Sequence, residues 1–348
     1  MPTQSYISGR KNILVTGGAG FIGSHLCDIL VKDSNVLCLD DFTTGIERNI
    51  DHLLKLPNFE FLKHDINEPL DLNETKEGKK FKVKFQGIQE IYHLACPTSA
   101  KNFDKLRIKT LLTNSQGMIN ILEIARKYKA KILFTSSSVV YGPRQKENPY
   151  FKEDFRGLVN FVSPRSCYDE GKRFAETAMV IYREMYGLDT KIARIFRTYG
   201  PRMPLFDGQM LPDFILAALN NKPLIIYGDE TFSSSFCYAV DIVDGLIRMM
   251  ASGETRPINL GHPTEIRMID IAKRILEKTN SKSEIVFRDP LLFMTPLGLP
   301  DITLAKEKLG WLPLTSLEEG LDKTIEDVEV NRFLLEPMLE KYYEREKK

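Results

Sequence analysis

The sequence lacks a long apolar run. Among its 348 residues, no stretch reaches the roughly 18 consecutive apolar residues that indicate a membrane-spanning helix. Residues 1–12 also lack the apolar segment of an export signal. We therefore expect a soluble protein that neither enters a membrane nor is exported.

An excess of one charge sign and paired cysteines are also missing. The 48 Lys and Arg residues nearly balance 47 Asp and Glu residues, and the net charge of +1 offers no electrostatic footprint for nucleic acid. The five cysteines are scattered without CxxC spacing, which argues against a disulfide framework or a zinc site. We expect no metal, no nucleic-acid partner and a reducing, cytoplasmic compartment.

A regular alternation of strand and helix patterns fills the first part of the chain. The β-branched runs that predict strands lie at residues 13–16, 36–39, 59–62, 90–94 and 131–134. Longer helical patterns separate them, which is typical of βαβ units in a parallel sheet. Residues 73–84 carry many charges and no apolar periodicity, so we predict a solvated surface loop there.

The rest of the chain is less regular. The pattern predicts helices at residues 172–186, 212–219, 241–250 and 334–348, and a strand at residues 191–196. Pro and Gly mark loops at residues 200–208 and 287–300. Loops carried on a scaffold are the usual place for a substrate site.

A glycine-rich turn follows the first predicted strand. Residues 17–26 read GGAGFIGSHL, with GxGxxG spacing between a strand and a helix. Such glycines let the backbone approach a pyrophosphate, whose charge is met by N–H groups at the helix N-terminus. A purely structural tight turn is the alternative. The predicted dinucleotide contacts are Gly17, Gly20, Phe21, Ile22 and Gly23.

Asp40 closes the second predicted strand, twenty residues after Gly20. A carboxylate there accepts hydrogen bonds from an adenosine ribose and repels a 2′-phosphate, which favours NAD over NADP. The alternative is that Asp40 and Asp41 only begin a turn. His25 and His64 lie outside any ligand-like cluster and are expected to be structural.

The predicted fold class is α/β, with a Rossmann-type doubly wound parallel sheet and a smaller C-terminal α/β substrate lobe. The NAD-binding domain is predicted to span residues 1–190 with parts of 191–260. The substrate lobe is expected at about 197–225 and 255–330, followed by a C-terminal helix at 331–348.

Tyr168 and Lys172 stand four residues apart at the start of a helical pattern, hence on the same helix face. A phenol has an unperturbed pKa near ~10, but a neighbouring ammonium and a nicotinamide cation would stabilise the phenolate. Tyr168 could then take a hydroxyl proton while hydride leaves for NAD. The serines of residues 136–138 supply hydroxyl donors that orient the reacting oxygen.

These motifs resemble an extended short-chain dehydrogenase/reductase family that acts on nucleotide sugars, and most closely its UDP-glucuronate decarboxylase branch. The resemblance runs from residue 11 to about residue 328. It is carried by ILVTGGAGFIGSHL (13–26), TGIERNIDHL (44–53), NFEFLKHDI (58–66), IYHLACPTS (91–99), SPRSCYDEGKRFAET (163–177), ARIFRTYGPRM (193–203) and LGWLPLTSLEEGL (309–321).

The resemblance implies a UDP-linked sugar substrate and assigns roles by motif. It implies Ser137, Tyr168 and Lys172 as catalytic residues. It implies further cofactor contacts at Asp65 near the adenine, Asn114 near the ribose, and at Ile66, Leu94, Ala95, Tyr168 and Lys172. It implies substrate contacts at Pro97, Ser138, Val139, Arg165, Arg197, Arg202 and Tyr227. It also implies a homodimer built from helices near residues 105–127 and 168–186.

One departure from the family pattern bears on the reaction. The decarboxylases and the related 4,6-dehydratases carry Glu where this chain has Val139. Dehydration needs a carboxylate to abstract a C5 proton, so Val139 counts against it. Decarboxylation of a 4-keto acid needs no base because the ketone accepts the electrons, and C4 epimerisation tolerates the change too.

Other departures bear on the substrate. The family's Asn is Arg197 here, its diphosphate-binding arginines are replaced by Ser234 and by residues around 297–299, and Gln209 replaces the Arg of an Asp-Gly-Arg segment. Arg165, Arg197 and Arg202 suit a bidentate grip on phosphate or carboxylate. Structural ion pairs are the alternative for Arg165 and Arg202, and a substrate with another head group stays open.

The leading hypothesis is C4 oxidation of a nucleotide-linked uronic acid by NAD, loss of CO2, and return of hydride to the same carbon. An NAD-dependent C4 epimerase, or an enzyme for another activated sugar, keeps the same residues and is the nearest alternative. A non-catalytic NAD-sensing protein and an ordinary dehydrogenase that releases NADH are further alternatives.

Overall fold

The computed structural model describes residues 9–98, 103–291, 294 and 296–346. The chain forms two compact units. Unit 1 comprises residues 1–96, 112–135 and 175–192, and unit 2 comprises residues 97–111, 136–174 and 193–348. The functional assignment of the predicted domains remains a prediction.

The central feature is a seven-stranded sheet with the order β12-β7-β5-β4-β1-β2-β3. Its strands are β1 (Asn12–Thr16), β2 (Asn35–Asp40), β3 (Phe59–Lys63), β4 (Glu90–His93), β5 (Lys131–Ser137), β7 (Thr190–Ile195) and β12 (Ile258–Leu260). β1 pairs in parallel with both β2 and β4, so the strand order reverses at β1. Such a reversal is where open α/β sheets bind ligands, at the carboxyl ends of the strands.

The predicted strands and fold class are confirmed. All six predicted strands overlap observed strands. Strands such as β1 are recognisable because a parallel strand that is buried on both faces carries a continuous apolar run. The predicted loop at residues 73–84 is wrong. It contains α2 (Lys76–Lys80) and the first two residues of α3 (Val83–Gln86). Thr75 caps α2, and its side chain accepts a hydrogen bond from the Gly78 N–H. Phe81 and Val83 anchor the segment in the core despite its charges.

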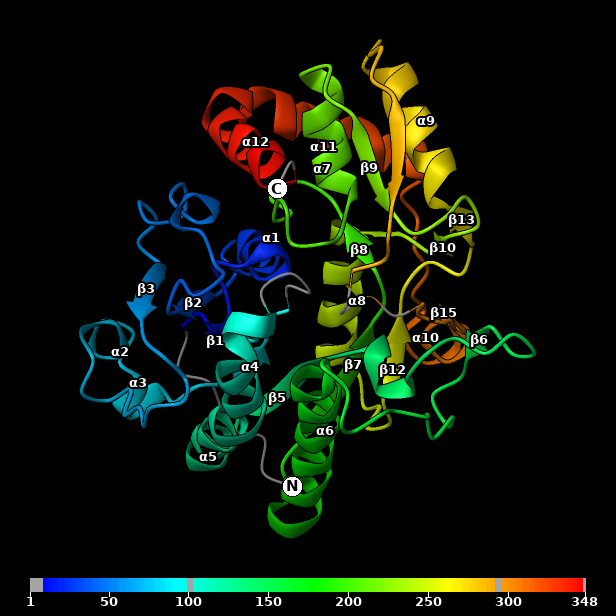
Figure 1. The fold of residues 1–348 in the computed structure, drawn as a ribbon. Coiled ribbons are helices and arrows are strands. Elements are labelled where there is room, and N and C mark those ends of the chain that lie inside the picture. Colours follow the sequence, from blue (N-terminus) through cyan, green and yellow to red (C-terminus); the bar gives the residue numbers. More distant parts are fainter. Residues whose placement is uncertain (1–8, 99–102, 292–293, 295, 347–348) are drawn as a thin grey trace. The chain divides into compact units, whose positions relative to one another are not determined.

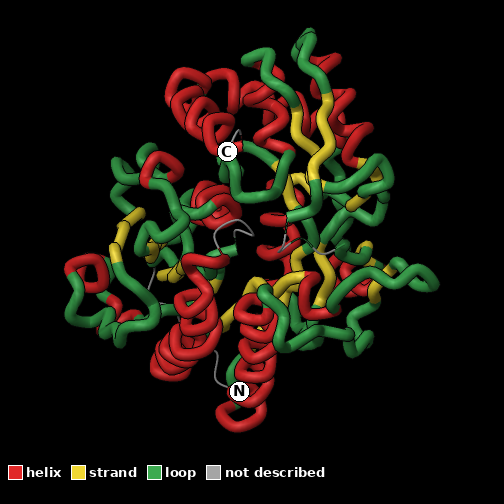
Figure 2. The backbone as a smooth tube through the Cα atoms, viewed as in Figure 1, coloured by secondary structure: helices red, strands yellow, loops and turns green. Residues whose placement is uncertain are grey.

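Helices cover the sheet of unit 1, as the alternation of red helices and yellow strands in Figure 2 illustrates. α1 (Phe21–Leu30) joins β1 to β2, and α5 (Met118–Tyr128) precedes β5. The crossover from β1 to β2 and the crossover from β4 to β5 run in opposite directions along the sheet. Because such crossovers are right-handed, α1 and α5 cover opposite faces of the sheet. The core of unit 1 includes Leu14, Leu37 and Ile91 from the strands and Ile121 and Leu122 from α5.

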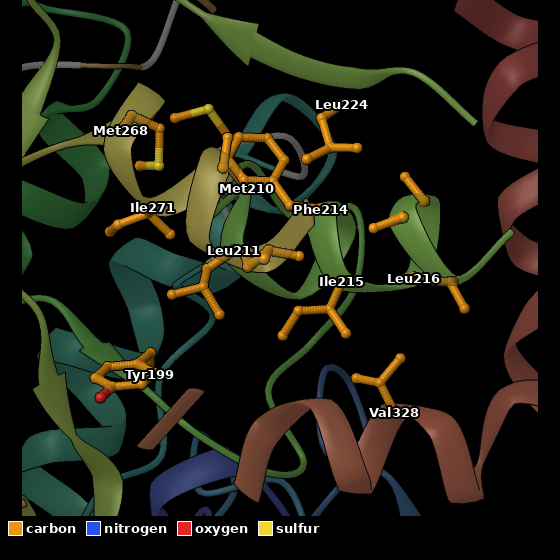
Figure 3. Packing of buried hydrophobic residues seen from close by; sticks show 14 of the residues in the cluster. Tyr199, Met210, Leu211, Phe214, Ile215, Leu216, Leu224, Met268, Ile271 and Val328 are labelled. Carbon is orange, nitrogen blue, oxygen red and sulfur yellow. The ribbon is translucent and has the colours of Figure 1, made fainter. Parts of the chain in front are cut away.

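A second core fills unit 2. Helix α7 (Leu211–Leu219) is apolar on most sides and packs against β9 (Leu224–Tyr227), α9 (Met268–Lys278) and α11 (Leu317–Val330). Figure 3 shows Phe214, Ile215 and Leu216 of α7 between Leu224 and Val328. The C-terminal helix α12 (Arg332–Glu346) lies beside α7 and α11 (Figure 1). This core carries the loops that follow β7.

The predicted helices at residues 172–186, 212–219, 241–250 and 334–348 correspond to α6 (Ser166–Tyr186), α7, α8 (Ala239–Ala251) and α12. The remaining elements are η1 (Glu47–Asn49), α4 (Phe103–Leu112), the π-helical turn η3 (Thr113–Gly117), η4 (Ser138–Tyr141), β6 (Tyr150–Phe151), β8 (Thr198–Tyr199), β10 (Ser233–Ser234), β11 (Cys237–Tyr238), β13 (Ile266–Arg267), β14 (Ile285–Arg288), β15 (Leu299–Pro300) and α10 (Thr303–Leu309). Among the described residues, no helix combines the length and apolarity needed to cross a bilayer.

Candidate active site

The glycine-rich turn joins β1 to α1 in unit 1 and is built around two close approaches. Gly17 adopts φ +72°, and a Cβ there would lie 2.7 Å from the backbone nitrogen of Ala95. A Cβ on Gly23 would lie 2.1 Å from the Gly17 carbonyl oxygen. Only glycine fits either position, and the N–H groups of Phe21 and Ile22 open the helix without intrahelical partners. This cradle fits a pyrophosphate.

Asp40 holds the same turn from the end of β2. Its Oδ2 accepts a hydrogen bond from the Ala19 N–H at 3.1 Å, and its Oδ1 accepts one from the Phe42 N–H at 2.9 Å. Burial raises the pKa of this carboxyl, while the two backbone donors lower it. Asn49 is a residue that the sequence reasoning missed. Its Nδ2 donates to the Ala19 carbonyl at 2.9 Å, and its only sequence signal is the TGIERNIDHL motif.

The loop after β3 carries two of the predicted cofactor residues. Asp65 accepts a hydrogen bond from the Asn67 N–H at 3.0 Å, and the Ile66 carbonyl accepts one from Asn120 of α5 at 2.8 Å. Across the reversal point, Asn114 lies in the π-helical turn η3, and its Nδ2 lies 3.1 Å from the sulfur of Cys96. Such turns are frequent at functional sites. These residues belong to unit 1 together with the glycine turn.

Two further contacts tie the ends of β1, β4 and β5 together. Thr16 Oγ1 lies 2.7 Å from His93 Nδ1, and both side chains are buried. The Thr135 hydroxyl donates to the His93 carbonyl at 3.2 Å. Leu94 and Ala95, both predicted to contact the cofactor, follow directly after His93. His93 was missed by the sequence reasoning, although it lies in the quoted motif IYHLACPTS.

The three predicted catalytic residues belong to unit 2. Ser137 ends β5 and caps η4, where its Oγ accepts a hydrogen bond from the Val139 N–H at 3.4 Å. Tyr168 and Lys172 lie in the first two turns of α6, with the Lys172 ammonium 5.7 Å from the centre of the Tyr168 ring. Tyr168 is 8% exposed and Lys172 2% exposed. The four-residue spacing therefore places a buried cation beside the phenol, as the sequence predicts.

The segment after Ser137 is fixed by a buried polar network. Ser138 and Val139 are buried in η4. The hydroxyl of Tyr141, at the end of this turn, donates to Asn259 Oδ1 at 2.7 Å and accepts from Arg194 Nη1 at 2.8 Å. Val139 presents an apolar side chain at the position where the family pattern has a carboxylate, so this position supplies no base.

Arg165 and Arg197 differ in how their charges are met. Arg165 Nη2 pairs with Asp169 Oδ1 at 3.2 Å, with both side chains 12% exposed. Burial lowers the pKa of the Arg197 guanidinium to about 10, while Asp207 raises it and Arg165 lowers it. Arg197 stays charged at neutral pH. Its Nε and Nη1 atoms are buried and have no hydrogen-bond partner among the described residues.

Two aromatic rings line the Arg197 guanidinium. Its central carbon lies 6.0 Å from the ring centre of Phe232 and 5.7 Å from that of Phe236, distances at which cation–π attraction operates. These rings stabilise the positive charge, but phenylalanine side chains have no oxygen or nitrogen atom that could accept a hydrogen bond from the guanidinium. A buried guanidinium with two unused donors is suited to an anionic ligand.

The other predicted substrate residues are more dispersed within unit 2. Pro97 lies in the loop after β4 and is buried. The Arg202 backbone N–H donates to Asp327 of α11 at 3.1 Å. The Tyr227 hydroxyl lies 2.5 Å from the Tyr342 hydroxyl of α12. The roles of these three residues in substrate binding remain predictions.

Comparison with known proteins places the chain in a family. A family model described as GDP-mannose 4,6 dehydratase matches residues 14–324. UDP-glucuronic acid decarboxylase 1 of Xenopus tropicalis is 42% identical over 317 residues, which are 91% of this chain and 72% of that protein. The structure of an epimerase from Methanothermobacter thermautotrophicus has a TM-score of 0.82 and 29% identity, covering 94% of this chain and 95% of that one.

A further solved structure contains ligands. UDP-glucuronic acid 4-epimerase from Bacillus cereus, in complex with UDP-glucuronic acid and NAD, has a TM-score of 0.80 and 26% identity, covering 92% of this chain and 99% of that one. The family match spans most of the chain, and the decarboxylase shares more than two fifths of its aligned residues. The chain therefore belongs to the family of NAD-dependent epimerases and dehydratases of the extended short-chain dehydrogenase/reductase type.

Proposed function

We propose that this protein is an NAD-dependent enzyme that decarboxylates UDP-glucuronic acid. The observation that carries the proposal is the pairing of a buried phenol and a buried ammonium, Tyr168 and Lys172, in a chain 42% identical to a UDP-glucuronic acid decarboxylase. The cofactor is supported by the glycine cradle, by the Asp40 carboxylate at the end of β2, and by the NAD-bound structural neighbour.

The chain's own groups would move protons and fix the sugar. Tyr168, as phenolate, takes the proton of the C4 hydroxyl, and Ser137 donates a hydrogen bond that orients the same oxygen. Lys172 stabilises the phenolate by its charge. NAD, when bound, supplies the acceptor and later the donor of the C4 hydride. Tyr168 then returns the proton as the C4 hydroxyl is restored.

Loss of CO2 needs no base on the protein. In the 4-keto acid the bond from C5 to the carboxylate breaks, and its electron pair moves into the C4 carbonyl to form an enolate. Solvent water then donates a proton to C5, which gives a 4-keto pentose. Val139 is compatible with this step because no group has to abstract the C5 proton. The same residue disfavours 4,6-dehydration, which requires that abstraction.

Arg197 is the proposed partner of the substrate's diphosphate. Its two buried donors, Nε and Nη1, lie on different edges of the guanidinium, and each can donate a hydrogen bond to an anionic oxygen. The Phe232 and Phe236 rings stabilise the charge from 6.0 and 5.7 Å. Arg165 adds positive potential nearby while it pairs with Asp169. This proposal follows the substrate contacts that the sequence predicts for Arg165 and Arg197. The ion pair between Arg165 and Asp169 is also what a purely structural role of Arg165 would predict.

C4 epimerisation of UDP-glucuronic acid is the second candidate. It is favoured by the Bacillus cereus epimerase, whose structure covers 92% of this chain. It uses the same proton transfer at C4, and it also tolerates Val139. The two reactions differ in the fate of the carboxylate, because an epimer keeps the mass of the substrate.

The deciding experiment is incubation of the NAD-loaded protein with UDP-glucuronic acid, followed by mass spectrometry of the product. Decarboxylation predicts a UDP-pentose that is lighter by one CO2, with no net accumulation of NADH. An isomer of unchanged mass would establish the epimerase. Accumulating NADH would establish a dehydrogenase, and an unchanged substrate would refute the proposal.

We also propose a homodimer. On α6, Ile181 is 48% exposed and Met185 is 70% exposed, and they lie four residues apart on one helix face; on α4, Ile108 is 76% exposed. Exposed apolar side chains gathered on one helix face are typical of interaction surfaces. A reducing, cytoplasmic compartment is supported by five cysteines that are all free thiols.

A further inference from the structure

The 200–210 loop, between β8 and α7, is held in a strained conformation. Three of its non-glycine residues have left-handed backbones: Arg202 (φ 63°), Phe206 (φ 56°) and Met210 (φ 65°). Such residues are uncommon, because the Cβ crowds the backbone, and they persist only where surrounding contacts hold them. The loop therefore depends on its neighbours for its conformation.

Two of those neighbours are carboxylates on adjacent helices. Asp327 of α11 accepts a hydrogen bond from the Arg202 N–H at 3.1 Å, and Asp213 of α7 accepts one from the Phe206 N–H at 2.6 Å. In both bonds the donor is the backbone N–H of a left-handed residue. They fix the loop's backbone at two points but leave the Phe206 side chain to be held by something else.

The C-terminal helix α12 holds that side chain. The Tyr342 ring stacks on the Phe206 ring with centres 4.5 Å apart and planes 16° apart. The Tyr342 hydroxyl lies 2.5 Å from the Tyr227 hydroxyl of β9, so the same residue joins the loop to the strand. Tyr342 itself is buried. The helix lies beyond residue 324, where the match to the family model ends.

Independent contacts fasten α12 to the body of unit 2. At its start, Arg332 donates to Asn220 Oδ1 at 2.9 Å, and Asn220 caps α7. Near its end, the Tyr343 hydroxyl donates to the Pro223 carbonyl. Leu335 and Leu339 belong to the apolar core of unit 2. Because these contacts hold α12 independently of the loop, they also fix the position of the Tyr342 ring against Phe206.

The residue after Phe206 connects this contact to the candidate active site. Asp207 is buried, and its negative charge attracts the Arg197 guanidinium. A shift of Phe206 would carry the neighbouring carboxylate with it. Phe206, on which Tyr342 stacks, is therefore covalently adjacent to the carboxylate that attracts Arg197. Arg197 is in turn the proposed binding partner of the substrate's diphosphate.

We propose that Tyr342 of α12 is a positioning residue for substrate binding, whose ring keeps the 200–210 loop in the strained conformation that sets Asp207 against Arg197. The identity of the ligand rests on the proposed function. Without the ring, the loop relaxes among several conformations, and only a fraction of molecules remains competent to bind. Apparent affinity falls by that fraction, while turnover of the bound substrate changes little.

The test compares Tyr342→Ala, Tyr342→Phe and wild type in the NAD-loaded full chain. The probes are UDP titrated by calorimetry, steady-state kinetics with UDP-glucuronic acid, and the rate of trypsin cleavage after Arg202. For Tyr342→Ala we expect UDP affinity to fall by about tenfold, the size of one aromatic pair. Cleavage after Arg202 should accelerate by a similar factor, KM should rise, and kcat should change by less than about twofold.

Tyr343→Phe is the matched control. It removes one hydroxyl from the adjacent residue of the same helix, at a contact that does not involve the loop. It should behave as wild type, and Tyr342→Phe, which keeps the ring, should stay within about threefold of wild type. Unchanged UDP affinity or an unchanged cleavage rate in folded Tyr342→Ala would overturn the proposal. Wild-type protein that fails to decarboxylate UDP-glucuronic acid, or to bind UDP, would instead refute the proposed function, and the cleavage rates would still decide the role of Tyr342.

Discussion

At the scale of single residues, the account depends on where charges are placed. Lys172 is almost fully buried and lies 5.7 Å from the Tyr168 ring centre, so its ammonium acts on the phenol without much solvent screening. Arg197 is also a buried cation, and its Nε and Nη1 donors have no hydrogen-bond partner in the part of the chain that the structure describes. In the proposed function, Lys172 assists proton transfer and Arg197 binds the ligand.

The replacement Tyr168→Phe tests the first of these roles. It removes only the hydroxyl that exchanges the C4 proton, so we expect kcat to fall by about 10²- to 10⁴-fold, the usual contribution of a general base. The NAD content of the purified variant should match wild type, because the glycine turn is unaltered. Activity within a few-fold of wild type would assign the proton transfer to another group.

Arg197→Met separates ligand binding from stability. It removes a buried cation with two unsatisfied donors, so the free energy of unfolding should stay within about 1 kcal/mol of wild type or rise. UDP affinity should fall by about ten- to a hundred-fold, as expected for lost charged hydrogen bonds. Thermal unfolding and calorimetry measure the two effects. A marked loss of stability with intact UDP affinity would show that Arg197 is structural.

Residue-scale prediction succeeded where a motif carries its own geometry. The GxGxxG turn could be located from the sequence because each close approach permits only glycine. Asn49 and His93 could not, because their contacts to Ala19 and Thr16 join segments 30 and 77 residues apart. The exposed or buried state of a polar side chain is set by such tertiary contacts, which no local pattern encodes.

At the scale of elements, hydrogen bonds connect the turn η4 after β5 to β12, and β12 to the loop after β6. Asn259 of β12 accepts a hydrogen bond from Tyr141, and its backbone N–H donates to Glu153 Oε1 at 2.9 Å. Burial raises the pKa of Glu153, while the Asn259 N–H lowers it. The contacts that support the turn after Ser137, the proposed catalytic serine, therefore include a carboxylate that is costly to ionise in the folded state.

Glu153→Gln tests this support through its pH dependence. Because the folded-state pKa is raised, the native state holds the Glu153 proton more tightly than the unfolded chain does. Wild-type stability should therefore decline as pH rises from the usual carboxyl pKa through the raised one. The Gln variant keeps an acceptor for Asn259 and should lack that decline. Urea unfolding from acid to neutral pH measures the difference, and a wild-type advantage that grows with pH would contradict it.

Element prediction followed apolar periodicity and failed where a few buried residues outweigh many charges. The strands were found because their apolar runs are continuous. The segment 73–84 was misjudged because Phe81 and Val83 fix two short helices whose other residues face solvent. The 200–210 loop was correctly predicted as a loop, but its left-handed residues could not be inferred, since Arg, Phe and Met carry no turn preference.

At the scale of the whole molecule, the proposed homodimer predicts which exposed apolar residues matter. Met185→Glu places a charge on the exposed face of α6 and should shift the protein from dimer to monomer in light scattering. Phe85→Glu is the control, because Phe85 of α3 is 85% exposed but lies outside α4 and α6. Equal dissociation by both variants, or by neither, would contradict the proposed interface.

The most direct test of the central claim follows the hydrogen on C4. UDP-glucuronic acid deuterated at C4 is incubated with the NAD-loaded protein, and the product is analysed by mass spectrometry. Because the hydride removed from C4 returns to C4 after CO2 leaves, the account predicts a UDP-pentose that is lighter by one CO2 and still carries deuterium. A product that keeps its carboxylate, or a pentose that has lost the deuterium, would contradict it.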